Sequence, residues 1–154
     1  MECLAVSLAN LPLNHRRSVA VTLRLMEERL EEVLQGLDQG ERITPTRKIV
    51  DDVDPACRAE LRRRIEWTLE QVGAYYMQLG LPPEEQSLFR TCNATLGLTW
   101  ELPPDLRPNR MKGYGHLPPE LAPELARLAE DLERTVLDVQ AMLIPRLNNL
   151  GDES

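Results

Sequence analysis

The sequence lacks the residue patterns from which most catalytic and metal-binding sites are built. Its 154 residues include only two histidines, His15 and His116, and neither belongs to a Glu-x-x-His pair of the kind that binds metal inside helical bundles. A Gly-x-Ser-x-Gly nucleophile turn and a Gly-x-x-x-x-Gly-Lys-Ser/Thr phosphate loop are also missing. We therefore expect no catalytic residue, no bound metal and no cofactor.

Aromatic residues make up only 4% of the chain, and no apolar run approaches the roughly 18 residues that a membrane-spanning helix needs. Aromatic and β-branched residues are enriched in strands, so their scarcity disfavours a sheet-rich fold. Cys3, Cys57 and Cys92 are odd in number and form no Cys-x-x-Cys pair, which suits a reducing compartment better than a disulfide framework. The sequence thus predicts a helical protein of the cytoplasm without a membrane partner.

Acidic residues outnumber basic ones, and the net charge is −7. Because phosphate neutralisation supplies much of the affinity of nucleic-acid-binding proteins, this balance disfavours a nucleic-acid partner. Basic residues nevertheless gather in two places. Residues 41–64 carry 7 basic and 5 acidic residues, and residues 103–118 carry 3 and 1. These two basic islands are the places where an anionic ligand would bind most readily.

Two long stretches have the apolar periodicity of an amphipathic helix. In the first, predicted over residues 15–38, apolar residues recur at spacings of four and three: Val19, Leu23, Met26, Leu30, Val33 and Leu37. The second, predicted over residues 120–147, repeats the pattern: Leu121, Leu125, Leu128, Leu132, Thr135, Val139 and Met142. Each seam is expected to face a hydrophobic core.

Two further helices are predicted between them, at residues 54–80 and 83–97. Asp54-Pro55 is typical of an N-cap followed by proline in the first helical turn, and Gly80 is a typical residue at a helix end. In the shorter helix, Leu88, Phe89, Cys92 and Leu96 are expected to face inward, and Gly97 to end the helix.

The remaining segments are predicted to connect these helices. Residues 39–53 are polar and contain a proline, and residues 98–117 form a Pro/Gly-rich loop. Four helices with one apolar face each predict an all-α protein, most simply an antiparallel four-helix bundle. We expect a single helical domain over residues 1–154, with residues 1–11 and 150–154 peripheral to it.

The phrase Leu-Pro-Pro followed by an acidic residue occurs at Leu81, Leu102 and Leu117. A leucine before the cap, proline in the first turn and an acid near the positive end of the helix dipole are features of a helix start. We therefore interpret the copies at 81 and 117 as helix starts. The copy at 102 lacks a following apolar stripe and predicts at most one turn.

The interval from Arg107 to His116 combines cations, aromatic rings and glycines between these copies. The candidate binding residues are Arg107, Arg110, Lys112, Tyr114 and His116, together with Arg62 from the other basic island. One interpretation is a solvated connector whose glycines allow positive φ. The other is a site for an anion or an acidic partner, because guanidinium groups suit carboxylate and phosphate. The sequence leaves both open.

Two other groups have a simpler structural interpretation. The glutamates of the first helix, Glu27, Glu28, Glu31 and Glu32, fall outside its apolar seam, so we expect them to face solvent. Cys57 lies in the first turn of a predicted helix, where the dipole favours a thiolate. It also continues an apolar stripe with Leu61 and Ile65, so we expect a small buried residue instead.

These observations favour a non-enzymatic helical-bundle protein that acts in protein–protein interaction or assembly and associates with itself. Seams on the first and last helices can continue across a two-fold interface, which predicts a homodimer. The alternative is binding or processing of a small anion or nucleotide, using loop 107–116 and the Glu-rich first helix.

Overall fold

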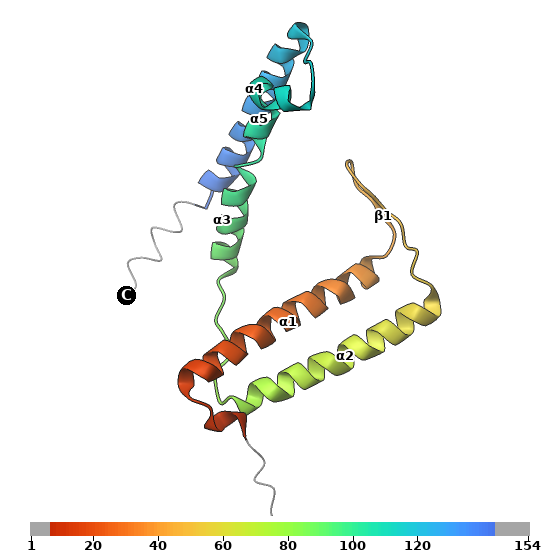
Figure 1. The fold of residues 1–154 in the computed structure, drawn as a ribbon, viewed down its shortest axis with the longest axis vertical. Coiled ribbons are helices and arrows are strands. Elements are labelled where there is room, and N and C mark those ends of the chain that lie inside the picture. Colours follow the sequence, from red (N-terminus) through yellow and green to blue (C-terminus); the bar gives the residue numbers. More distant parts are fainter. Residues whose placement is uncertain (1–6, 144–154) are drawn as a thin grey trace, which may run out of the picture. The chain divides into compact units, whose positions relative to one another are not determined.

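A computed structural model describes residues 7–143. Of this part, 73% is helical and 3% is strand, which confirms the all-α prediction. The chain divides into two compact units, Met1–Pro83 and Glu84–Ser154. Each unit contains a pair of helices that run in opposite directions (Figure 1). The four-helix bundle and the single domain stay predictions.

The first unit is a hairpin of two long helices, α1 (Leu13–Gln39) and α2 (Pro55–Gln78), preceded by a short 3-10 turn at Leu8–Asn10. Both helices lie within two residues of their predicted ranges. The start of α2 is as the sequence predicted, with Pro55 in the first turn and Asp54 as N-cap. The Asp54 carboxylate accepts a hydrogen bond of 2.9 Å from the backbone N–H of Cys57.

Arginine side chains connect the two helices at both ends of the hairpin. Near the start of α1, Arg16 Nη1 donates to the carbonyl oxygen of Leu79 at 3.0 Å. Near the start of α2, Arg58 Nη1 donates to the carbonyl oxygen of Leu37 at 2.7 Å. The last carbonyls of a helix have no partner within it and carry partial negative charge. Each helix thus satisfies the C-terminal end of the other, which fixes their antiparallel register.

A small β-hairpin joins α1 to α2, where the sequence predicted only a polar connector. Strand β1 (Arg42–Ile43) pairs with β2 (Lys48–Ile49), with Arg42 opposite Ile49. The turn is closed by the N–H of Thr44, which donates to the carbonyl of Arg47 at 2.8 Å. Strands of two residues are too short to show an alternating pattern, so they could not be predicted from apolar periodicity.

The second unit is built around α3 (Leu88–Thr99) and α5 (Ala122–Ala141), which runs back along it (Figure 1). α3 begins at Leu88 rather than at residue 83, because the Ser87 hydroxyl caps it by accepting from the N–H of Arg90 at 3.2 Å. It continues beyond Gly97 to Thr99. The end predicted for the last helix, residues 144–147, lies outside the described residues.

The segment between α3 and α5 was predicted to be irregular, and this was wrong. It contains four short helical elements: η2 (Pro103–Leu106), α4 (Pro108–Met111), η3 (Lys112–Tyr114) and η4 (Pro119–Leu121). Three of these have proline in the first turn, where its fixed φ suits a helix. The Leu-Pro-Pro copies at 102 and 117 therefore each begin a single helical turn, and the turn at 117 leads directly into α5. The copy at 81 begins no helix.

Few apolar side chains are fully enclosed in the described part of the chain. They are Ala20, Ile65, Val72 and Leu79 in the first unit and Ala129 in the second. Leu79 is the one large side chain among them with no exposed surface. The hairpin of the first unit therefore has a narrow core, and Leu79 occupies it beside the Arg16 contact.

We predict that Leu79→Ala lowers the free energy of unfolding by about 2–5 kcal/mol, because it leaves a cavity in a small core. Met77 provides a matched control, since its side chain is 82% exposed two residues earlier on the same helix. Met77→Ala should change the free energy by less than about 0.5 kcal/mol. Urea denaturation followed by circular dichroism measures both, and equal losses would contradict the assignment of the core.

Candidate functional site

Arg107, the first candidate of the basic loop, is turned toward α5. Its Nη2 donates to both carboxylate oxygens of Glu133, at 3.0 and 2.9 Å. The Glu133 side chain is 19% exposed and that of Arg107 is 41% exposed. The guanidinium thus joins the start of α4 to the middle of α5. Its contact is structural in this state rather than directed at a ligand.

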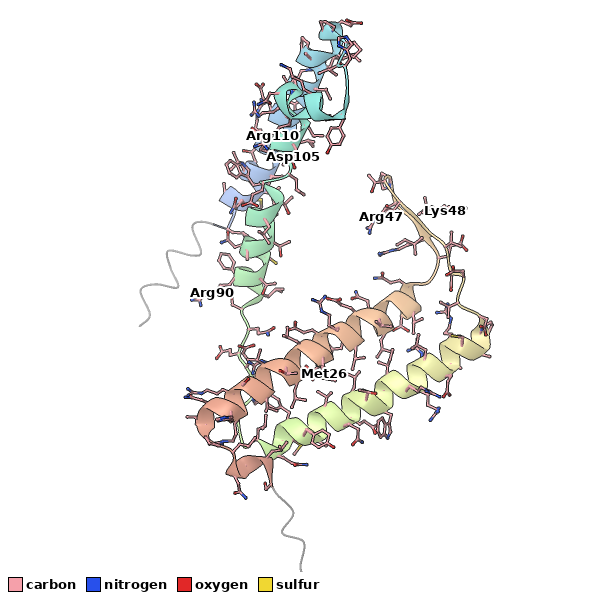
Figure 2. All side chains as sticks on the ribbon, viewed as in Figure 1. Met26, Arg47, Lys48, Arg90, Asp105 and Arg110 are labelled. Carbon is pink, nitrogen blue, oxygen red and sulfur yellow. The ribbon has the colours of Figure 1, made fainter. Side chains whose placement is uncertain are left out.

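The other candidates of the loop lie on its surface. Arg110 is in the last turn of α4 (Figure 2), and Lys112 and Tyr114 are in η3. All three are exposed, as is His116, and the Tyr114 side chain is 90% exposed. Gly115 adopts a φ of 124°, as expected for a glycine that lets the chain turn. Binding of an anion or a partner by these residues stays a prediction.

The basic island of α2 is largely neutralised by acidic residues of its own unit. Arg62, the candidate from this island, forms an ion pair with Asp38 of α1. Arg63 and Arg64 both contact Glu60, at 2.7 and 2.6 Å. Two hydrogen bonds, the stronger influence from Arg63 and the next from Arg64, lower the pKa of the Glu60 carboxyl to about 2. Glu60 and Asp38 thus offset part of the island's positive charge, which weakens the case for an anion site there.

Neither cysteine that the structure describes is enclosed, contrary to the sequence prediction. Cys57 and Cys92 are both exposed, and Leu88 is 78% exposed. Of the four residues of α3 that were expected to face inward, Phe89 and Leu96 are half-buried, as are Asn93, Gly97 and Thr99. This face is set by α5, because Gly97 lies against the Gln140 side chain. Glu27, Glu28, Glu31 and Glu32 are exposed, as predicted.

The next surface is the apolar seam of α5. From the sequence, this seam was expected to face a core and to be able to continue across a two-fold interface. Instead its side chains are substantially exposed: Leu121 47%, Leu128 45%, Leu132 41%, Val139 44% and Met142 76%. Only Leu125 is half-buried among its leucines. The fully enclosed residue of α5 is Ala129, one position after Leu128.

The small side chains of α5 explain this orientation. α5 packs along η2, whose Pro103 is buried, and along α3. Ala129 is enclosed and Ala126 is half-buried, and side chains this small allow a neighbouring backbone to approach closely, which a leucine at the same position would prevent. The Arg107–Glu133 pair then fixes the rotation of α5 about its axis. The leucine seam is left on the adjacent, open face.

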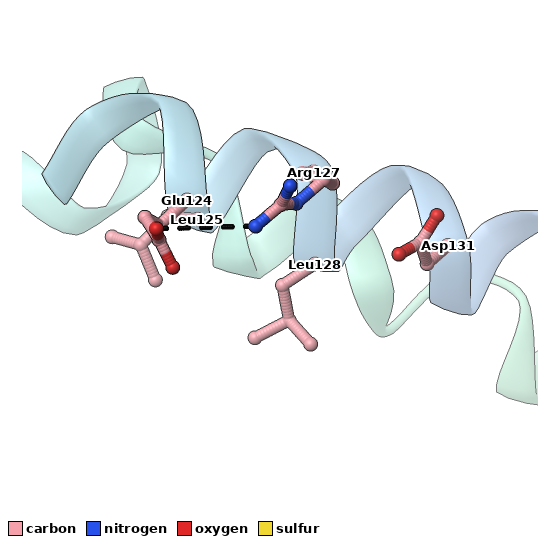
Figure 3. A pocket seen from close by; sticks show the side chains of 5 residues that line it. All are labelled: Glu124, Leu125, Arg127, Leu128 and Asp131. Carbon is pink, nitrogen blue, oxygen red and sulfur yellow. Dashed lines mark ion pairs between the residues drawn. The ribbon is translucent and has the colours of Figure 1, made fainter.

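A shallow hollow of about 370 Å³ lies on this open face. It is lined by Glu124, Leu125, Arg127, Leu128 and Asp131. Figure 3 shows Leu128 projecting away from the helix, with the ion pair between Glu124 and Arg127 beside it. The hollow therefore combines an apolar floor with carboxylates at its edge.

The seam of α1 is open along one edge. Leu23, Leu30 and Leu37 are half-buried, whereas Met26 is 42% and Val33 43% exposed (Figure 2 labels Met26). Because Val19, Met26 and Val33 recur every seven residues, they form one continuous apolar strip along the helix. The first unit thus also has an apolar surface that its own two helices leave uncovered.

No protein-family model, no curated protein and no solved structure matches the chain. Within residues 7–143, no group of three or more histidine, cysteine or acidic side chains is placed to hold a metal ion. No helix in that same range is long and apolar enough to cross a membrane.

Replacing Arg107 should destabilise the second unit more than replacing its neighbour. We predict that Arg107→Gln lowers the free energy of unfolding by about 1 kcal/mol, because a partly exposed charged hydrogen bond is lost and Glu133 is left unpaired. Arg110→Gln, on an exposed side chain three residues later, should have an effect below about 0.5 kcal/mol. Thermal denaturation of both variants measures the difference, and an equal effect of the two would count against the structural role of Arg107.

The Glu60 carboxyl should titrate far below an ordinary glutamate. Its pKa is about 2 in the folded protein against 4.5 for an ordinary glutamate, so its contribution to stability is fully present above pH 4.5. That contribution should be lost as the pH falls toward 2. A ¹³C NMR titration of the carboxyl should show this, and Arg63→Gln should move the midpoint back toward 4.5. A normal midpoint in the unmodified protein would refute the pairing.

Proposed function

We propose that this chain is a non-enzymatic helical protein that acts in protein–protein interaction or assembly and associates with itself. Two features that occur together support the proposal: few apolar side chains are buried, and long apolar seams are exposed. Leu121, Leu128, Leu132 and Val139 of α5 and Met26 and Val33 of α1 are each between 41% and 47% exposed. Contiguous exposed apolar surface of this kind usually marks an interaction site.

Self-association is best supported at the open edge of α1. In an antiparallel two-fold pair centred on Met26, Val19 of one copy lies opposite Val33 of the other. The residues beside this strip, Thr22 and Arg29, then face each other, so no like charges meet. Two α1–α2 hairpins paired in this way form a four-helix bundle from two copies of the chain, which differs from the bundle of four helices within one chain that the sequence predicted.

Binding of a small anion or nucleotide is the alternative proposal, with weaker support. Arg107 and Arg62, two of its six candidate residues, already pair with Glu133 and Asp38. Arg110, Lys112 and His116 remain as exposed groups that an anion can approach. A thermal-shift screen with phosphate and Mg²⁺-nucleotides tests it, because a shift that Arg110→Gln abolishes would favour this alternative.

The proposed dimer predicts a specific response to a charge at its centre. At micromolar concentration, sedimentation velocity should show a species of twice the 17.6 kDa chain mass. Met26→Lys should raise the dissociation constant at least about tenfold, because two lysines then meet at the two-fold axis.

Leu25→Lys is the matched control, since Leu25 is the neighbouring residue and its side chain is 51% exposed outside the strip. This variant should sediment like the unmodified protein. A single 17.6 kDa species for the unmodified protein, or equal effects of the two substitutions, would refute self-association through α1.

A further inference from the structure

We propose that the seam of α5 is the docking site for a partner helix whose apolar stripe is flanked by lysine or arginine. The α5 seam consists of Leu121, Leu125, Leu128, Leu132, Thr135 and Val139. The inference rests on the proposed interaction function and names the chemistry of a partner. It concerns a different surface from the α1 strip, so the two can fail separately.

The spacing of the α5 seam is that of a helix that packs against another helix. Its members alternate at intervals of four and three residues, which keeps one stripe facing a straight partner. From Leu121 to Val139 the stripe is about 27 Å long at the helical rise per residue. A partner of about five turns covers it. An amphipathic helix that places anchors into such a groove is a common mode of recognition.

The open flank of the α5 seam is acidic. Glu124, Asp131 and Asp138 recur every seven residues, immediately before successive members of the stripe. Glu124 and Asp131 have side chains that are 69% and 61% exposed. Their contacts with Arg127 and Arg134 are 3.9 Å long and lie at the surface, where such pairs contribute little. These carboxylates are therefore available to a cationic partner.

The opposite flank carries no charge. It consists of Ala122, Ala129 and Val136, and Ala129 is fully enclosed in the packing of its own unit. Glu124, Asp131 and Asp138 are thus the charged residues directly beside the α5 seam, and the arginines that pair with the first two, Arg127 and Arg134, lie farther from it. Residues beside the stripe of paired helices determine which partner is accepted, so this flank selects a basic helix.

A second copy of α5 does not satisfy these requirements. In an antiparallel two-fold pair the same flanks of both helices meet, which places Glu124, Asp131 and Asp138 against their own copies. In a parallel pair each acidic flank meets the opposite flank, where Ala129 is already covered. Like-charge contact in the first case and steric exclusion in the second disfavour self-pairing here. The occupant is a different helix.

The hollow on the α5 seam fits a long cationic side chain. Its floor is formed by Leu125 and Leu128, and its edge carries Glu124, Asp131 and the Arg127 side chain that pairs with Glu124 (Figure 3). Lysine and arginine lay their aliphatic stems on apolar surface and hold the charge at its border. A basic residue beside the partner's stripe therefore gains both an apolar contact and an ion pair in this hollow.

Two synthetic peptides of about 18 residues test the proposal against the full-length chain. Both have leucine in a heptad stripe, and the flanking residues are lysine in one and glutamate in the other. Fluorescence anisotropy at physiological ionic strength should show the lysine peptide binding at least about tenfold more tightly. Failure of the lysine peptide to bind, or equal binding of both peptides, would overturn the proposal.

Substitutions locate the site and exclude attraction by net charge alone. Leu128→Asp should weaken the lysine peptide at least about tenfold, whereas Leu137→Asp should leave its affinity within about twofold. These two leucines are 45% and 47% exposed on different faces of α5. Asp131→Lys should reduce the preference for the lysine peptide, and Glu130→Lys, outside the flank, should not. Equal effects within either pair would place binding elsewhere and refute the proposal.

The same measurements in the Met26→Lys background separate the two proposals. Peptide binding that persists in this variant supports the α5 site independently of self-association. Loss of peptide binding together with dimerisation would mean that the α5 seam does not bind a partner by itself, and would overturn the inference. If the Leu128 side chain were protected from solvent at low protein concentration, another segment of the chain would have to cover the α5 seam. That result would also overturn the inference.

Discussion

The packing of alanine on η2 determines which face of α5 is available. Ala129 is fully enclosed, and the Arg107–Glu133 pair fixes the rotation of the helix from the next turn. Because leucines lie beside the alanines rather than among them, close approach of η2 leaves the α5 seam uncovered. A rotation by one residue position would enclose Leu128 and expose Ala129. The interaction surface thus follows from one side-chain pair and one small residue.

The sequence predicted the existence of the long helices but not the orientation of the last one. Asp54, Pro55 and the periodic apolar residues determine α2 locally, so its bounds could be read from the chain. Periodicity identifies which residues of α5 are apolar, yet the choice between a leucine face and an alanine face depends on the partner element. That partner, η2, lies in a segment that had been expected to be irregular. The two-residue strands were missed because they carry no pattern.

The candidate site residues show the same division between contacts that are local in the sequence and contacts that depend on the fold. Composition located the basic residues, and the contacts of Arg63 and Arg64 with Glu60 are local, because these residues lie three and four positions apart on one helix. The partner of Arg107 is 26 residues away, and the partner of Arg62 is 24 away, so only the fold reveals them. Two of the cations that the sequence suggested for ligand binding, Arg107 and Arg62, form ion pairs within their own units. Apolar surface, rather than charge, remains as the main feature open to a partner.

The orientation of the α5 seam is the central claim, and paramagnetic relaxation of methyl groups tests it directly. In the dilute chain, a soluble gadolinium chelate should relax the methyls of Leu128 and Leu132 strongly. The methyls of Ala129 and Leu79 in the same spectrum should be nearly unaffected, since both residues are fully enclosed. Leu128 methyls as protected as those of Leu79, or a strongly relaxed Ala129 methyl, would contradict the account.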